Sequence, residues 1–172
     1  NAEMVFQGRL VDGDLRAFGG LIDSVAPGGG LTPKEGEVVV EAEGLLLLPG
    51  AIDPQVHFRE PGQPEKEDIG SGSKAAASGG VTSFLDMPNN VPSATSMGAM
   101  RSKIASASRN AVTHHGFFIG ATQDNLPELQ AAVGTPHSPT SVDGVCGIKI
   151  FMGSSTGDLL VNEQDALEQI FS

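Results

Sequence analysis

The chain has 172 residues, of which 39% are hydrophobic, and its formal net charge is -11, with a pI of about 4.6. This size and composition allow a packed core of one ordinary domain or one and a half, and they exclude a mainly disordered chain. The excess of acids disfavours nucleic acids and anionic membranes as partners, because both require clustered Lys and Arg. No apolar run approaches the ~18 residues of a membrane span. We therefore expect an acidic, soluble cytoplasmic protein, and a small anionic substrate stays open because a few local cations would decide it.

Residues 1–48 contain short β-rich runs separated by Gly, Asp and Pro. The runs are MVFQGRLV, GLIDSVA and EVVVEAEG, and none has the period of a helix. The pattern predicts a small antiparallel β unit that forms a segment of a sandwich. Asn1 and Ala2 resemble the remnant of an expression tag, and we expect no structural role for them.

Residues 49–172 form a second domain, in which strand-like and helix-like segments alternate. The strand-like runs are LLLLPGAIDPQVHF, GGVTSFLDMP, HHGFFIGAT and GVCGIKIFMG. The helix-compatible segments that follow them are EKEDIGSGSKAAAS, SMGAMRSKIASASRN, DNLPELQAAV and NEQDALEQIF. A strand and a helix that recur at about 30 residues predict βα units, whose parallel strands are buried on both faces.

Four such units are compatible with two α/β architectures. One is a complete open sheet, and the other is about half of a TIM-type barrel, since eight units need about 250 residues. The first strand lacks the phosphate-binding glycine pattern of dinucleotide folds, and the last helix has no Gly or Pro stop. Both features favour the first four units of a truncated barrel. Its open sheet edges would need a second half, a dimer or more chain, and we expect a homo-oligomer.

The carboxyl ends of these strands carry the candidate site residues, because active sites of parallel α/β folds gather there. Gln55, His57 and Arg59 end the first strand, and Asn89 and Asn90 follow the second. Gln55 and His57 are two residues apart, so on a strand they face the same side, as two ligands of one metal ion would. The alternatives are a hydrogen-bonded core histidine and two asparagines that only form a turn.

Lys149 lies among apolar residues in the fourth strand, GIKIF, where we expect a buried central position. A buried lysine needs a partner or a changed charge. Lys149 either extends to solvent from the strand end or lies neutral at the barrel mouth. There it would add carbon dioxide and become a carbamate that bridges two metal ions.

Other polar residues are weaker candidates. The hydroxyl groups of GSSTG at residues 153–157 have no identifiable base nearby, and their glycines indicate a binding turn. His114 and His115 begin a strand, which is the wrong end for catalysis, and we expect His137 to face solvent. Cys146 lies in an apolar segment and is expected to be a small core residue.

Three segments in this order resemble the amidohydrolase superfamily, and specifically dihydroorotase. They are PGAIDPQVHFREPG, FLDMPNNVPSAT and GIKIFMGSSTGDLLV. The resemblance extends from about residue 4 to the last residue, and the third segment also resembles hydantoinases and dihydropyrimidinases. The resemblance implies an amidohydrolase TIM barrel with a small β-sandwich, and the reversible cyclisation of N-carbamoyl-aspartate to dihydroorotate in pyrimidine synthesis.

The resemblance also implies site roles and a cofactor, one or two zinc ions. His57 would be a metal ligand, Lys149 the carboxylated bridging ligand, and Arg59 and Asn89 would hold the substrate carboxylate. The family's two further histidine ligands and its catalytic aspartate have no counterpart in this chain. We therefore expect these 172 residues alone to be inactive and to bind zinc weakly.

Gln55 departs from the family pattern, since it stands where the family has a histidine ligand. A neutral amide is a poor zinc ligand beside imidazole, so this ligand position is expected to be weakened or lost. Two alternatives therefore remain beside dihydroorotase. One is a related cyclic amidase, namely a hydantoinase, dihydropyrimidinase or allantoinase. The other is an impaired subunit that scaffolds aspartate transcarbamoylase. Arg59 favours a substrate with a carboxylate, and the retained His57 and Lys149 argue against complete loss of catalysis.

Overall fold

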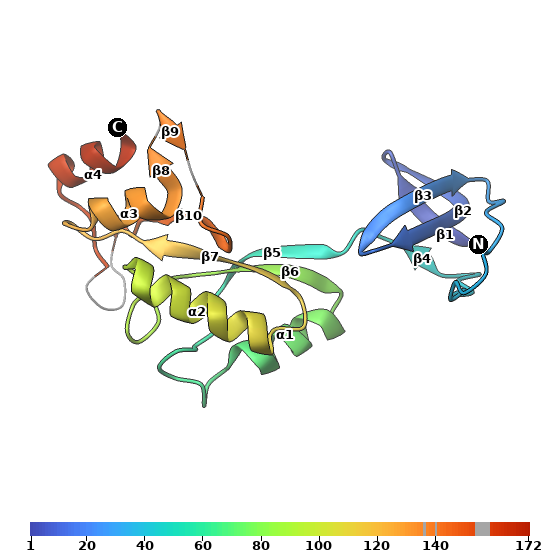
Figure 1. Ribbon diagram of the computed structural model, residues 1–172, viewed down its shortest axis with the longest axis horizontal. Helices are drawn as coiled ribbons and strands as arrows, with labels where there is room; N and C mark the ends of the chain where they lie inside the picture. The colour runs from blue at the N-terminus through green and yellow to red at the C-terminus, as the bar shows by residue number, and fades with distance from the viewer. Residues whose placement is uncertain (136, 140, 154–158) are drawn as a thin grey trace. The chain divides into compact units, whose positions relative to one another are not determined.

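The structure is a computed structural model, which describes residues 1–135, 137–139, 141–153 and 159–172. The chain divides into two compact units, Asn1–Pro49 and Gly50–Ser172, and each is considered by itself (Figure 1). Within the described part of the chain, no helix combines the length and the apolar character needed to span a membrane.

The first unit is a four-stranded sheet with the order β3-β2-β1-β4. Its strands are β1 (Ala2–Phe6), β2 (Arg9–Phe18), β3 (Leu21–Pro27) and β4 (Leu46–Leu47). The first three strands form antiparallel hairpins, whereas β4 pairs parallel to β1. Both hairpins turn through two residues with positive φ, Gln7-Gly8 and Gly19-Gly20. Such turns match the twist of the flanking strands.

Two expectations for this unit are wrong. The run EVVVEAEG is not a strand, and Val38 is 91% exposed. Valine favours strands only where a pleated, half-buried surface receives it, and the described residues offer none here. Asn1 and Ala2 do have structural roles, because Ala2 pairs with Gly13 in the sheet and Asn1 Oδ1 accepts a hydrogen bond from the Ala42 amide.

The second unit is built on a parallel sheet with the order β10-β7-β6-β5. Its strands are β5 (Ala51–Val56), β6 (Val81–Asp86), β7 (His114–Gly120) and β10 (Val145–Lys149). The helices between and after them are α1 (Ile69–Ser78), α2 (Met97–Asn110), α3 (Leu126–Val133) and α4 (Gln164–Phe171). A short hairpin, β8 (Gly134–Thr135) and β9 (Ser138–Pro139), follows α3. The predicted succession of strands and helices is confirmed.

The first three helices, α1, α2 and α3, pack in chain order along the sheet (Figure 1). Helix α1 contacts β6 and α2, α2 contacts β7 and α3, and α3 contacts β10. The core between these layers centres on Phe84, Phe117 and Ile119. Burial on both faces does not hold for every strand: β5 is mostly exposed, and it forms one edge of the described sheet, while β10 forms the other.

The close approach of α1 to the loop after β5 requires a glycine. A Cβ atom on Gly72 would lie 2.5 Å from Cε1 of Phe58, whose ring packs edge-on against Phe84 at 4.7 Å. We expect Gly72→Ala to lower the free energy of unfolding by about 1–3 kcal/mol, as overpacking does. Gly98→Ala on α2 is the control, because its Cβ would meet only Ser96 Oγ, at 3.8 Å. Urea unfolding followed by circular dichroism measures both, and equal midpoints would contradict the prediction.

Candidate active site

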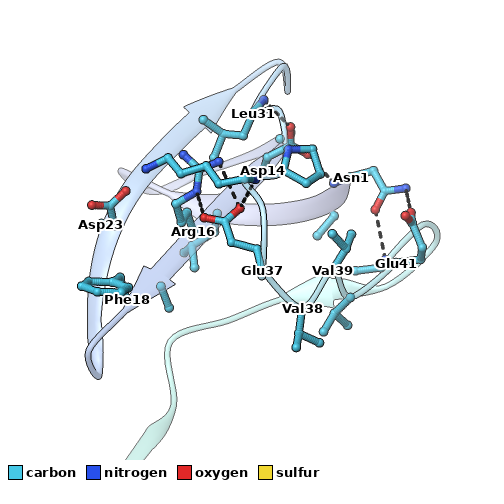
Figure 2. Close-up of a pocket in the computed structure, with 18 of the residues that line it drawn as sticks. Asn1, Asp14, Arg16, Phe18, Asp23, Leu31, Glu37, Val38, Val39 and Glu41 are labelled. Atoms are coloured by element: carbon cyan, nitrogen blue, oxygen red, sulfur yellow. Dashed lines mark hydrogen bonds and ion pairs between the residues drawn. The ribbon is translucent and has the colours of Figure 1, made fainter.

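A hollow in the first unit offers little chemistry. It is a groove of about 1190 Å³ beside β2 and the segment 31–42 (Figure 2). Its lining residues, all within the described range 1–47, include no histidine, cysteine, serine or threonine. Two of its charged side chains, Arg16 and Glu37, form an ion pair with each other at 2.8 Å. The groove therefore does not hold the candidate site.

The register of the second sheet brings two of the predicted loops to the same level. Val56 pairs with Asp86 at the carboxyl ends of β5 and β6, and the Met87 amide donates to the Val56 carbonyl at 3.0 Å. The loops that begin at His57 and Met87 therefore leave the sheet side by side. His57 Nδ1 lies 2.8 Å from Asn89 Oδ1, so the structure places these two predicted site residues in contact.

This contact determines which nitrogen of His57 is available. The Asn89 oxygen can only accept a hydrogen bond, so Nδ1 of His57 carries the proton and donates it. In this tautomer Nε2 carries the lone pair that a metal ion would bind. A histidine that donates from one nitrogen to a fixed partner, and offers the other, has the arrangement of a typical metal ligand.

Arg59 lies two residues beyond His57 on a loop that is well held by its backbone. Its amide donates to the Glu67 carbonyl at 2.9 Å, and its carbonyl accepts from the Gln63 amide at 2.8 Å. The side chain is half-buried, and it forms no ion pair with any residue in the described ranges. Its guanidinium group is thus available for an anionic ligand.

A buried ion pair lies beneath these loops. Lys103 Nζ, on α2, is 2.8 Å from Oδ2 of Asp86, the last residue of β6, and Lys103 is 1% exposed. Burial raises the pKa of Asp86, and the Lys103 ammonium opposes this shift. Burial likewise lowers the pKa of Lys103, against the effect of Asp86. The charged form of each side chain is therefore stabilised mainly by the opposite charge of the other.

Lys149 lies apart from the His57–Asn89 contact. It is the last residue of β10 and is half-buried, and β6 and β7 lie between β10 and β5 in the sheet. Its Nζ is 5.2 Å from the centre of the Phe151 ring. The expected central position is thus wrong for the described sheet, where β10 is an edge strand. The residue does lie at the same, carboxyl edge as His57 and Asn89.

Gln55 is exposed on β5, and its backbone N–H donates to Asp53 Oδ1 at 3.1 Å. The pairing of β5 with β6 shifts between Asp53 and Val56. The regular alternation that would turn Gln55 and His57 to one side is therefore interrupted at this point.

The remaining candidates lie elsewhere. His114 and His115 begin β7 at its amino end, and His137 is exposed. Cys146 is exposed, so the expected core position is wrong; partial desolvation of its sulfur raises the pKa of the thiol to about 11. The hydroxyl groups of the GSSTG segment, at residues 154–156, lie outside the described residues.

The side chains at this edge of the sheet could provide some, but not all, of the ligands of a metal ion. In the described portion of the chain, no group of three or more His, Cys, Asp or Glu residues is placed to hold a metal. His57 nevertheless uses Nδ1 for Asn89, which leaves Nε2 as the nitrogen that could bind a metal, and Lys149 lies at the same edge of the sheet. The residues present can therefore supply part of a metal centre.

Comparisons with known proteins show the family to which this chain belongs. Residues 44–138 match the family described as dihydro-orotase-like. The chain belongs to the dihydroorotase-like family. Among the curated relatives of this chain, a dihydroorotase of Methanosarcina acetivorans is 37% identical over 78% of this chain and 28% of its own length. A dihydroorotase of Halobacterium salinarum is 41% identical over 87% of this chain and 33% of its own length. An allantoinase of Solibacter usitatus is 33% identical over 89% of this chain and 31% of its own length.

A solved structure confirms the fold expected for a dihydroorotase-like chain. L-hydantoinase (dihydropyrimidinase) from Arthrobacter aurescens superposes with a TM-score of 0.75 at 22% identity, over 99% of this chain and 36% of its own. The second unit is therefore part of an amidohydrolase-type TIM barrel. This chain spans about a third of the length of the curated relatives it matches.

Sequence reasoning missed Lys103, and it placed Asp86 at the end of the second strand without assigning it a role. The sequence does hold a signal for Lys103, since Met97, Met100 and Ala107 place it on the apolar stripe of α2 at helical spacing. A charge on such a stripe requires a buried partner. Asp86, the charged residue directly after Phe84 and Leu85 in an apolar strand, was the available candidate.

Proposed function

We propose that the chain is part of a dihydroorotase, a zinc-dependent enzyme that cyclises N-carbamoyl-L-aspartate reversibly to dihydroorotate in de novo pyrimidine biosynthesis. The observation that carries this proposal is the 2.8 Å contact of His57 with Asn89, with Arg59 on the same loop as His57. One pair of neighbouring loops thus offers an imidazole for a metal and two donors for a carboxylate. The dihydroorotases among the curated relatives support this substrate class.

In this proposal Arg59 and Asn89 bind the carboxylate of the substrate. The planar guanidinium group of arginine can donate two parallel hydrogen bonds to a carboxylate. Asn89 uses Oδ1 for His57, which leaves its Nδ2 as a further donor. The two side chains together would orient the ring with its scissile amide toward His57.

His57 and Lys149 would hold the zinc, as one or two ions. The neutral amine of Lys149 would add carbon dioxide and release a proton, which gives a carbamate with two ligating oxygens. When bound, zinc supplies Lewis-acid activation of the ring carbonyl and of water. Gln55 stands at a weakened or lost ligand position, because imidazole is the better zinc ligand.

Ring opening adds a water oxygen to the carbonyl carbon, breaks the amide C–N bond and transfers a proton to the leaving nitrogen. The described residues bind and orient the substrate, and none of them is assigned the proton transfer. We therefore propose that residues 1–172 alone do not turn over, and that the activity belongs to the complete protein.

The test is ring opening by the complete protein with zinc supplied, on dihydroorotate and in parallel on hydantoin, dihydrouracil and allantoin. We expect kcat/KM for dihydroorotate to exceed that for the uncharged rings by about 100-fold or more, because an unpaired Arg59 in a closed site is costly. Preference for an uncharged ring would replace the proposal by another cyclic amidase. No turnover by folded protein would favour the impaired subunit.

A further inference from the structure

Lys103 has an unusual environment for a lysine. Its ammonium group donates to the Met87 carbonyl at 2.8 Å and to Asn90 Oδ1 at 2.6 Å, and it forms the ion pair with Asp86 at 2.8 Å. The ammonium group thus has two hydrogen-bond acceptors and one counterion, whose Oδ2 forms no hydrogen bond of its own with any described residue. All three partners belong to the end of β6 or to the loop after it, and two of them flank the segment that carries Asn89.

The same partners reach across to the loop after β5. Asp86 Oδ1 accepts a hydrogen bond from the Phe58 amide at 3.0 Å. Asn90 Nδ2 donates to the carbonyls of Phe58 at 3.0 Å and of Glu60 at 3.1 Å. Since lysine can only donate and these carbonyls can only accept, the orientation of the Asn90 amide is determined by its neighbours. Phe58, between His57 and Arg59, is thus held on both its backbone groups.

Stability alone does not account for this arrangement. Two charges that are almost fully buried have a large desolvation cost, and well-packed apolar residues often stabilise a core as well as such a pair. What apolar residues cannot do is fix the direction of two loops, since dispersion contacts are not directional. The contacts of Lys103 determine where the residues on both sides of the site lie.

We propose that Lys103 is a positioning residue, which acts through Asp86 and Asn90 to fix the loop of His57 and Arg59 relative to the loop of Asn89. This inference rests on the proposed function for what the two loops bind. In this proposal Lys103 itself contacts neither substrate nor metal, since it is 1% exposed and its ammonium group faces Asp86, Met87 and Asn90.

The test compares Lys103→Met with Met100→Ala in the complete protein. Met100 is fully buried one turn earlier on α2, so its truncation lowers stability through a cavity without removing a polar contact. Arg101→Met removes an exposed cation from the same helix and controls for net charge. The measurements are backbone hydrogen exchange in segments 57–62 and 87–94, and kcat and KM for dihydroorotate.

We expect exchange in both segments to rise by about tenfold or more in Lys103→Met and to stay near the wild-type rate in both controls. KM should rise by about tenfold or more only in Lys103→Met, because small misplacements of binding groups have large effects. Exchange and KM that match those of Met100→Ala would show a purely structural role and overturn the proposal.

A second variant covers the case in which Lys103→Met does not fold. The double variant Asp86→Asn/Lys103→Met buries no net charge, and it can keep an acceptor for the Phe58 amide. Loosening of segment 87–94 in this variant supports the proposal, and wild-type exchange there overturns it. If the wild-type protein opens no dihydroorotate ring, the proposed function fails, while the exchange comparison still decides the role of Lys103.

Discussion

Replacing Lys149 with alanine in the complete protein is expected to lower kcat for dihydroorotate by about 1000-fold or more, with loss of bound zinc. Under the proposed function, no carbamate could form without the amine, and the zinc would lack one of its proposed ligands. Lewis-acid activation contributes several kcal/mol to such reactions, and each ~1.4 kcal/mol changes the rate tenfold. Initial rates and the metal content of the purified protein measure the two effects.

Lys149→Arg is the informative control for this prediction. Arginine keeps the positive charge and can keep the contact with the Phe151 ring, which Lys149 makes at 5.2 Å, but it does not form a carbamate under these conditions. We expect this variant to be as inactive as Lys149→Ala. Full activity of Lys149→Arg would show that only the cation matters at this strand end. Lys74→Ala, at an exposed position on α1, controls for loss of a lysine.

Gln55→His tests the proposed metal centre in the opposite direction. Gln55 is exposed on β5, so the substitution should leave the fold intact, and an added imidazole should raise zinc content at limiting metal. Unchanged zinc content would mean that this position is never filled, or that Gln55 already serves as a ligand.

The second large effect is expected at Arg59. Arg59→Met should lower kcat/KM for dihydroorotate by about 100-fold or more, because loss of one partner from a desolvated charge pair costs about 2–5 kcal/mol. The rate with an uncharged ring such as hydantoin should change little. The ratio of the two kcat/KM values therefore separates a carboxylate-binding role from a general loss of structure.

Two matched variants sharpen the interpretation of Arg59. Arg59→Lys keeps the charge but not the planar fork, so its kcat/KM should lie between the wild-type and methionine values. Lys66→Met removes an exposed cation from the same loop and should have no effect on either substrate. An equal loss on both substrates in Arg59→Met would contradict the assigned role.

Most of the second unit could be predicted from local sequence. The apolar runs predicted β5, β6, β7 and β10, and the segments between them predicted the helices, because strand and helix periods are properties of short windows. The same reasoning failed for EVVVEAEG in the first unit, which has the composition of a strand. Whether such a run becomes a strand depends on the surface that it meets, and composition does not report that surface.

The sequence by itself determined which residue types stand at the carboxyl ends of the strands, and hence that His57, Arg59, Asn89 and Lys149 share one edge of the sheet. Only the tertiary structure decided which of them touch. The His57–Asn89 contact joins residues that are 32 positions apart, and it depends on the pairing of Val56 with Asp86. The partners of Lys103 likewise follow from the packing of α2 beneath two loops. Contacts of this kind depend on sheet register and helix docking, which no local pattern of residues encodes.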